Sequence, residues 1–273
     1  MMYLSSIVAG SLRYEFWMQL RRRSVWIVLT LLVVLIFLLW QGFGNHYMYG
    51  HYAGDPHAPS RGWVPPLQSG AILMWAQIMA MFLPVGVGLL LADRVARDRQ
   101  IHVDELFDTL LGPLGARLLG KFLGSVLATL VPIVLLYAMG IGYILTQVPG
   151  LPGISLAAEA FATILLPGML FVAGFSLAVP VVLKVPIYQF LFTGYWFWAN
   201  LMSPKIGLPS PVGTMINAAG PYASEGFFNF QWTFLILHAT VAQGIESVAL
   251  LVGLGLVGLI GGWGYLRWQQ AQR

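Results

Sequence analysis

Residues 93–121 read DRVARDRQIHVDELFDTLLGPLGARLLGK and form the one strongly charged stretch in a sequence of 273 residues that is otherwise apolar. The stretch contains five of the ten acids and five of the fourteen Lys and Arg residues, and apolar runs flank it on both sides. A charged side chain at the centre of a bilayer costs about 2.5–3.5 kcal/mol on the insertion scale, so ten of them oppose spanning by about 25 kcal/mol or more. We therefore predict a water-facing loop between two membrane spans, with a surface that a soluble partner can bind.

The composition indicates an integral membrane protein. Hydrophobic residues make up 58% of the sequence and charged residues 9%, whereas a soluble domain has about 25% charged residues. The sequence has no cysteine, which excludes a disulfide framework, thiolate catalysis and a cysteine-based zinc site. We predict an all-α membrane protein.

The apolar runs predict six transmembrane helices in a single domain that covers residues 1–273. About 20 apolar residues cross a bilayer core. The predicted spans are residues 25–43, 71–91, 118–145, 156–183, 187–202 and 245–266. Residues 1–23 have apolar residues at helical spacing with polar residues between them, which predicts an amphipathic helix lying in the membrane interface. The first run is too long for a signal peptide and has no small-x-small cleavage site.

Three long connections join these spans, and the first is the outer loop of residues 44–70. Residues 92–117 form the charged loop between the second and third spans. Residues 203–244 lie between the fifth and sixth spans and contain four prolines, yet the stretch from Trp232 to Val241 is apolar. We predict that this connection partly re-enters the membrane without crossing it.

The distribution of basic residues predicts the orientation. Six spans place both termini and the charged loop on one side. Twelve Lys and Arg residues fall there: Arg13, Arg21, Arg22, Arg23, Arg94, Arg97, Arg99, Arg117, Lys121, Lys184, Arg267 and Arg273. The other side has Arg61 and Lys205. Because basic residues favour the cytoplasmic side, we expect a multi-pass protein of a bacterial-type plasma (inner) membrane with both termini cytoplasmic.

Residues 115–122 read GARLLGKF and differ from a phosphate-binding loop only at the last position, where Phe122 replaces the hydroxyl that would bind magnesium. The helix that follows enters lipid, so we do not predict a nucleotide site. Gly120 and Gly124 instead predict close helix packing. The basic residues near the inner headgroups are interpreted as anchors; they are Arg21, Arg22, Arg23, Arg117 and Lys121.

Ser176 in the fourth span and His238 ahead of the sixth resemble the layout of rhomboid-type intramembrane serine proteases. No glycine follows Ser176, and His238 precedes the last span rather than lying in it. Small polar residues in membrane helices commonly serve packing. Packing is therefore the favoured interpretation, and proteolysis is an alternative.

Other titratable residues leave two interpretations open. His46, His51 and His57 share the first outer loop, where a solvated loop is favoured over a metal site. Glu159 and Glu246 lie near the outer ends of predicted spans. Each either has a functional role within the membrane or stabilises a helix N-terminus by complementing its dipole.

Polar side chains inside the predicted spans are costly if they face lipid. We predict that they face a partner helix or a transport pathway. The candidates are Gln77 in the second span and Gln189, Trp196 and Asn200 in the fifth.

The order of these parts resembles the membrane subunit of an ATP-binding-cassette (ABC) transporter of the type-2 export permease family. In that family an interfacial elbow helix precedes six spans with cytoplasmic termini, and a segment between the fifth and sixth spans partly re-enters the membrane. Residues 92–110, ADRVARDRQIHVDELFDTL, and residues 117–121, RLLGK, are similar to the family's charged loop, its apolar docking patch and the Gly-Lys before the third span. Residues 111–113, Leu-Gly-Pro, depart from the more polar turn expected there and leave the helix boundaries of the loop open.

The resemblance implies ATP-driven export of an apolar or amphipathic substrate, such as a peptide, an antibiotic or a lipid-linked molecule. The chain itself is then no enzyme and binds no cofactor, because a separate ABC ATPase, present in two copies, binds ATP and magnesium. A second permease copy or paralogue and membrane lipid are further partners, and no nucleic acid is expected. The implied ATPase-coupling residues are Asp98, Asp104, Glu105, Leu106, Phe107 and Asp108. The alternatives are an intramembrane serine protease using Ser176 and His238, or a non-catalytic membrane regulator or assembly protein.

Overall fold

The computed structural model describes residues 2–45, 67–100, 113–147, 152–202, 209–230 and 237–272, and within these ranges all regular secondary structure is helical. The α-helices are α1 (Met2–Leu20), α2 (Arg23–Asn45), α3 (Leu67–Gln100), α5 (Leu114–Gln147), α6 (Pro152–Ala160), α7 (Leu166–Ala178), α8 (Val185–Leu201), α9 (Pro221–Phe228) and α10 (Val241–Ala271). A π-helical turn (Phe161–Leu165) joins α6 to α7, and a 3₁₀ turn (Val179–Val181) follows α7. The predicted all-α class is confirmed for these ranges.

Five of the helical segments are long and apolar enough to cross a membrane. They are Arg23–Gln41, Ser69–Arg94, Gly115–Gln147, Gly153–Val181 and Val241–Ala271. These segments correspond to the first, second, third, fourth and sixth predicted spans and indicate a multi-pass membrane protein. The fifth predicted span coincides with α8, whose 17 residues extend about 26 Å, whereas a bilayer core is about 30 Å thick.

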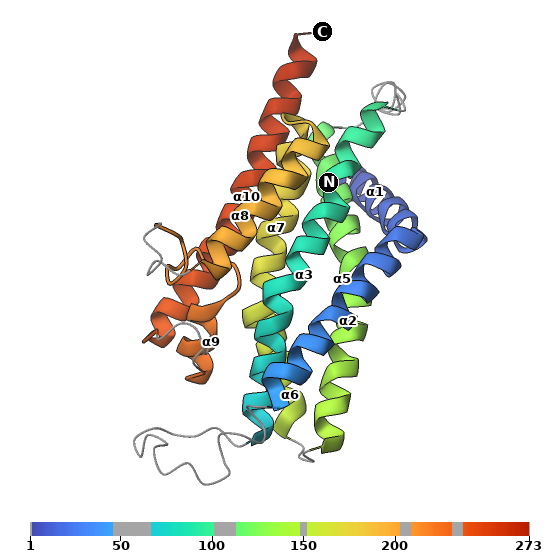
Figure 1. Cartoon of the computed structure of the whole chain (residues 1–273). Coiled ribbons are helices and arrows are strands. Elements are labelled where there is room, and N and C mark those ends of the chain that lie inside the picture. The colour runs from blue at the N-terminus through green and yellow to red at the C-terminus, as the bar shows by residue number, and fades with distance from the viewer. Residues whose placement is uncertain are drawn as a thin grey trace, which may run out of the picture.

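The long helices run alternately up and down the bundle (Figure 1). Helices α2, α5 and α8 begin at its upper end, which we define as the end where α3, α7 and α10 finish (Figure 1). Helix α1 lies across the bundle near this end, and residues 209–230 with α9 lie toward the lower end (Figure 1). Helix α3 is central, since it packs against α2, α5, α7 and α8.

The helices extend further into the charged stretch than predicted. Helix α3 continues to Gln100 and α5 begins at Leu114, so both ends of the expected loop at residues 92–117 are helical. The prediction that the whole stretch faces water is wrong for Arg94, which is 2% exposed. The insertion scale describes a charge that faces lipid, and a charge that meets a partner inside the protein avoids most of that penalty.

Close backbone contacts at glycine hold two pairs of helices together. A Cβ atom at Gly120 would lie 2.7 Å from the Val8 carbonyl oxygen, and one at Gly124 would lie 2.6 Å from that of Leu12. Helix α1 therefore packs directly into the groove that the two glycines leave in α5, as the glycine spacing predicted. Helix α7 meets α10 in the same way, since a Cβ at Gly174 would lie 2.3 Å from the Gly255 carbonyl oxygen.

Part of the connection between α8 and α10 is buried within the protein, ahead of the stretch that we expected to enter the membrane. Residues 217–220 are buried although they form no helix, and Gly220 has a φ of 76°. Residues 231–236, which include the first half of the apolar stretch that we expected to enter the membrane, lie outside the described residues. Buried backbone outside a helix must find hydrogen bonds from neighbouring side chains, and those bonds involve predicted site residues.

Candidate functional site

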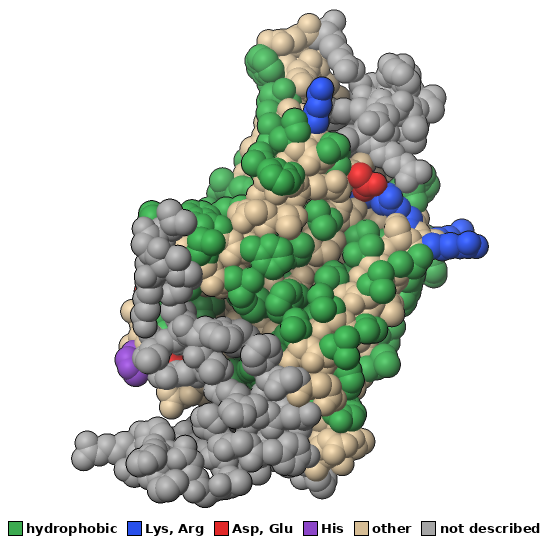
Figure 2. Space-filling view, in the orientation of Figure 1, with side chains coloured by type: hydrophobic (Ala, Val, Ile, Leu, Met, Phe, Trp, Pro, Cys, Tyr) green, Lys and Arg blue, Asp and Glu red, His purple; other side chains and the backbone are tan. Residues whose placement is uncertain are grey.

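The described basic side chains gather at the upper end of the bundle. On the face shown in Figure 2, the Lys and Arg side chains drawn in blue lie in the upper half of the molecule. By their positions in the helices, the same end contains Arg13, Arg21, Arg22, Arg23, Arg94, Arg117, Lys121, Lys184 and Arg267. The helices thus bring together residues that the sequence spreads over more than 250 positions.

At the centre of this region, Arg94 of α3 pairs with Glu15 of α1 inside the protein. The Arg94 Nε donates to Glu15 Oε1 at 2.8 Å, and Nη2 of the same guanidinium donates to that oxygen as well. The Ser125 hydroxyl of α5 donates to Glu15 Oε1 at 3.0 Å. The two charged side chains are 2% and 4% exposed, so solvent screens their attraction little.

The helix contacts explain why Glu15 is inside. A Cβ atom at Gly124 would lie 2.8 Å from the Glu15 Cβ, so the glycine groove of α5 draws this face of α1 against the bundle. Ser125 follows Gly124 directly and meets the carboxylate. The predicted helix at residues 1–23 exists, but its polar residues Glu15 and Gln19 are buried rather than turned to the headgroups.

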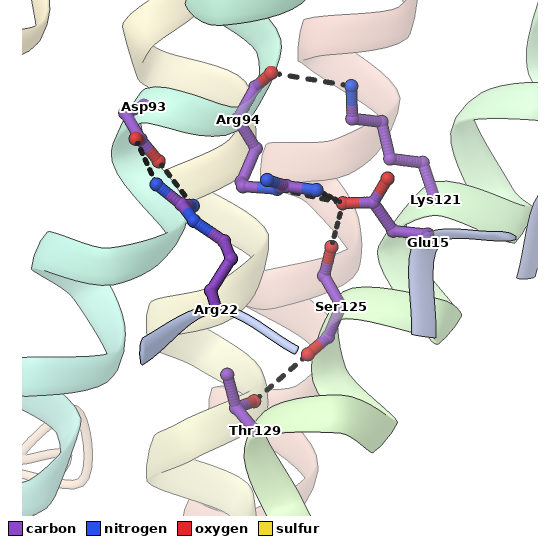
Figure 3. Close-up of polar contacts among 7 residues, drawn as sticks. All are labelled: Glu15, Arg22, Asp93, Arg94, Lys121, Ser125 and Thr129. Atoms are coloured by element: carbon purple, nitrogen blue, oxygen red, sulfur yellow. Dashed lines mark hydrogen bonds and ion pairs between the residues drawn. The ribbon is translucent and has the colours of Figure 1, made fainter. Parts of the chain in front are cut away.

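A second ion pair fixes the start of α2 to the same part of α3. The Arg22 Nη2 lies 2.9 Å from Asp93 Oδ2, and these side chains are 21% and 35% exposed. Asp93 and Arg94 are consecutive, yet one holds Arg22 and the other holds Glu15 (Figure 3). Lys121 Nζ also donates to the Arg94 carbonyl oxygen at 3.4 Å.

We call these six residues the corner clamp: Glu15, Arg22, Asp93, Arg94, Lys121 and Ser125 (Figure 3). The clamp joins the corner between α1 and α2 to the ends of α3 and α5 that flank residues 101–112. Gln19 is fully buried one turn beyond Glu15, and its amide has no hydrogen-bond partner among the described residues. Sequence reasoning identified Arg22 and Lys121 as anchors but missed the pairing of Glu15 with Arg94.

The four predicted pathway residues make hydrogen bonds to protein backbone. Gln189 Nε2 donates to the Leu89 carbonyl oxygen at 3.2 Å, and Trp196 Nε1 donates to that of Met81 at 2.7 Å, so both side chains tie α8 to α3. The other two bind the backbone of one residue in the buried connection, Ala219. Gln77 Nε2 donates to the Ala219 carbonyl oxygen at 2.6 Å, and the Ala219 N–H donates to Asn200 Oδ1 at 3.1 Å. Gln189 and Trp196 thus face a partner helix, Gln77 and Asn200 face the buried connection, and a pathway role stays a prediction.

Replacing Gln77 with methionine is expected to lower the free energy of unfolding by about 1–3 kcal/mol, because the buried Ala219 carbonyl loses its donor. Gln189→Met is the matched control and should cost less than about 1 kcal/mol, since the Leu89 carbonyl lies within α3 and belongs to a helical hydrogen-bond ladder. Denaturant unfolding in detergent micelles measures both values. Equal losses would contradict the assignment of Gln77 as the residue that holds the connection.

Several candidates are not brought together. The Ser176 hydroxyl is buried 2.7 Å from the Tyr188 hydroxyl of α8. Gly174 meets Gly255, and α10 begins 14 residues before Gly255, about 21 Å nearer the lower end. His238 precedes that start, so it lies far from Ser176 in this arrangement. Glu159 and Glu246 are both exposed.

The ATPase-coupling residues are mostly beyond the described part of the chain. Asp98 lies in the last turns of α3, whereas Asp104, Glu105, Leu106, Phe107 and Asp108 lie outside the described residues, as do His46, His51 and His57. One buried acid escaped sequence reasoning. Glu225 of α9 is 6% exposed and its Oε2 has no hydrogen-bond partner within the described ranges. The only sequence feature that could have singled it out is an acid four residues after Pro221 in an otherwise uncharged segment.

The corner clamp consists of ion pairs and a serine that donates to a carboxylate, with no nucleophile beside a free base. Among the described residues, no group of three or more His, Cys, Asp and Glu is placed to hold a metal ion. Searches against protein-family models and against curated proteins found no match to this chain.

Proposed function

We propose that this chain is the permease subunit of an ABC exporter of the type-2 kind, working with a separate cytoplasmic ATPase. The observation that carries the proposal is the corner clamp. It links α1, α2, α3 and α5 at the two helix ends that flank residues 101–112. A load applied to those residues by a soluble partner passes through one buried and one partly exposed ion pair into three membrane helices.

The proposal takes α8 as the fifth of six spans. Helix α8 runs opposite to α7 and α10 (Figure 1), which returns the chain to the lower side before α10 crosses again. Six crossings place both termini at the upper end, where the described Lys and Arg residues gather. By the positive-inside rule this end is cytoplasmic, in a bacterial-type inner membrane. Helix α1 is then the elbow, and the buried residues 217–221 with α9 are the re-entrant segment.

In such a transporter, ATP hydrolysis and the translocation pathway belong to different subunits. Two copies of the ATPase bind ATP and magnesium, and a coupling helix seats in each ATPase through Asp98, Asp104, Glu105, Leu106, Phe107 and Asp108. The apolar pair Leu106 and Phe107 supplies burial, and the acids set the orientation. A second copy of this chain or a paralogue completes the pathway for an apolar or amphipathic substrate.

The experiment that tests the proposal is affinity purification of the tagged chain from its native membrane in mild detergent, followed by mass spectrometry and an ATPase assay. We expect a stoichiometric ABC ATPase and vanadate-sensitive ATP hydrolysis. A chain that purifies alone and without ATPase activity overturns the proposal, and the regulator and protease functions then become the ones to test.

Reversing two charges in the coupling segment is expected to separate the subunits. The double substitution Asp104→Lys and Glu105→Lys should reduce ATPase recovery in the pull-down at least about tenfold, because like charges at a docking surface cost several kcal/mol. The amount of chain in the membrane fraction should stay unchanged. Asp55→Lys, in the outer loop of the proposed topology, is the control and should recover the ATPase normally. Normal recovery with the double variant would count against coupling at this segment.

A further inference from the structure

The outward face of the corner between α1 and α2 has a composition of its own. Three cations and three aromatic side chains are exposed there: Arg13, Tyr14, Trp17, Arg21, Arg23 and Trp26. We call this set the corner patch. Residues 1–45 contain one acid, Glu15, and it is used inside the bundle by Arg94. The patch therefore has a charge of +3 that no acid of α1 or α2 offsets.

The three consecutive arginines at the corner, Arg21, Arg22 and Arg23, point in different directions. Arg22 turns inward and pairs with Asp93. Arg21 and Arg23 are exposed, and the Arg21 guanidinium lies over the Trp17 ring at 6.0 Å from its centroid. Figure 2 shows basic side chains projecting at the right-hand edge, where α1 meets α2 in Figure 1. Two arginines are thus available to an external ligand.

Local hydrogen bonds fix the shape of the patch. The Trp26 indole N–H donates to the Leu20 carbonyl oxygen at 2.8 Å, across the corner. The Arg21 N–H donates to the Trp17 carbonyl oxygen at 3.2 Å, which continues the last turn of α1. A surface held in this way loses less conformational entropy when it binds a ligand.

An exposed apolar stripe begins directly beside the patch. Along α2, Ile27 and Leu31 follow Arg23 at intervals of four residues and are 57% and 65% exposed. Val34 and Leu38 continue the same face of the helix, at 52% and 63% exposed. Residues spaced in this way lie one above another on a helix. Cations with aromatic rings at one end and an apolar stripe leading away from them match a molecule with an anionic head and an apolar tail.

We propose that the corner patch binds the headgroup of an anionic phospholipid, with an acyl chain along the stripe of α2. Tyr and Trp rings prefer the depth of the headgroups, which places the arginines level with lipid phosphates. An acidic protein surface would match the arginines alone and would leave the stripe unexplained. This inference is independent of the proposed transport function, because it rests on α1 and α2 only.

The test uses the purified full chain in mild detergent, with thermal unfolding followed as lipid is added. Phosphatidylglycerol should raise the unfolding temperature more than phosphatidylcholine does, because a ligand that binds the native state stabilises it. Free glycerol phosphate should have no effect, since it has no tail. In the double variant Arg21→Gln and Arg23→Gln, the apparent affinity for phosphatidylglycerol should fall about tenfold or more, given the contribution of each basic residue near an anionic surface.

Arg267→Gln is the matched control, because Arg267 also lies over a tryptophan, Trp263, at 5.6 Å from the ring centroid. This variant should retain the full response to phosphatidylglycerol. The unfolding temperature in phosphatidylcholine shows whether each variant is folded, and native mass spectrometry counts the retained lipid directly. An equal response to both lipids, an unchanged response in the double variant, or a stabilisation by glycerol phosphate equal to that by lipid overturns the proposal. Loss of an acidic protein partner with an unchanged lipid response would identify a protein-docking surface instead.

Discussion

Replacing Glu15 with leucine is expected to lower the free energy of unfolding by about 3–5 kcal/mol. The substitution leaves Arg94 buried without a counter-charge, and removing one member of a buried ion pair is far more costly than the pair is stabilising. Arg94 is 2% exposed and has no described acid besides Glu15 within salt-bridge distance. Denaturant unfolding in detergent micelles measures the loss.

Two further variants separate the cost of an orphaned charge from other effects of the substitution. The double variant Glu15→Leu and Arg94→Met should recover most of the lost stability, because apolar side chains of similar size often replace a buried pair without loss. Asp93→Asn breaks the more exposed pair with Arg22 and should cost about 1 kcal/mol or less. A double variant as unstable as Glu15→Leu alone would contradict this account of the site.

The double variant also bears on the proposed function. It keeps the packing of α1 on α5 through Gly120 and Gly124 but removes the charged link from α1 to α3. If the corner clamp transmits movement from residues 101–112, ATP hydrolysis by the assembled transporter should lose its dependence on substrate while the subunits stay associated. Stability and coupling are thereby measured on one protein.

The lengths of the apolar runs predicted most of the fold, because a lipid bilayer requires its helices to be both long and apolar. A membrane helix needs about 20 apolar residues, so a single sequence displays its spans as runs, and five of the six predicted runs match long apolar helices. The remaining run is the fifth predicted span, and its helix α8 is a few residues too short. Helix ends were harder to place, because the charges at Asp93 and Arg94 read as solvent-exposed when each is weighed alone.

The corner clamp was beyond prediction for a different reason. Glu15 and Arg94 are 79 positions apart, and periodicity in one sequence says which face of a helix is apolar but not which helix lies next to it. Gly120 and Gly124 came nearest to a signal, because they showed that some backbone approaches α5 closely. Nothing in their spacing showed that the approaching helix is α1.

The buried connection between α8 and α10 shows the same limit for backbone. Hydropathy favoured Trp232 to Val241 as the part that enters the membrane. Residues 217–221 include Asn217, Gly220 and Pro221, which are typical of an exposed turn. Their burial is compensated at Ala219, whose carbonyl oxygen accepts from Gln77 and whose N–H donates to the side-chain oxygens of Asn200 and Asn217. Gly168 makes room for the neighbouring carbonyl, since a Cβ there would lie 2.2 Å from the Ala218 oxygen.

The second large effect is expected at the contact between α7 and α10. Gly174→Ala should lower the free energy of unfolding by about 3 kcal/mol, because the added methyl would lie 2.3 Å from the Gly255 carbonyl oxygen and a helix backbone cannot rotate away as a side chain does. The two helices must separate to accept it. Unfolding in detergent micelles gives the magnitude, and the midpoint should fall together with it.

Gly253 supplies the control for this substitution, since it lies two residues from Gly255 on α10 and a Cβ there meets nothing within 4 Å. Gly253→Ala should raise the free energy of unfolding by about 0.5–1 kcal/mol, because alanine restricts the unfolded chain and favours the helix. The two substitutions add the same methyl group and should change stability in opposite directions. A loss of equal size at both positions would mean that alanine is unfavourable in these helices for a reason other than contact, and the packing of α7 on α10 through Gly174 and Gly255 would then have to be revised.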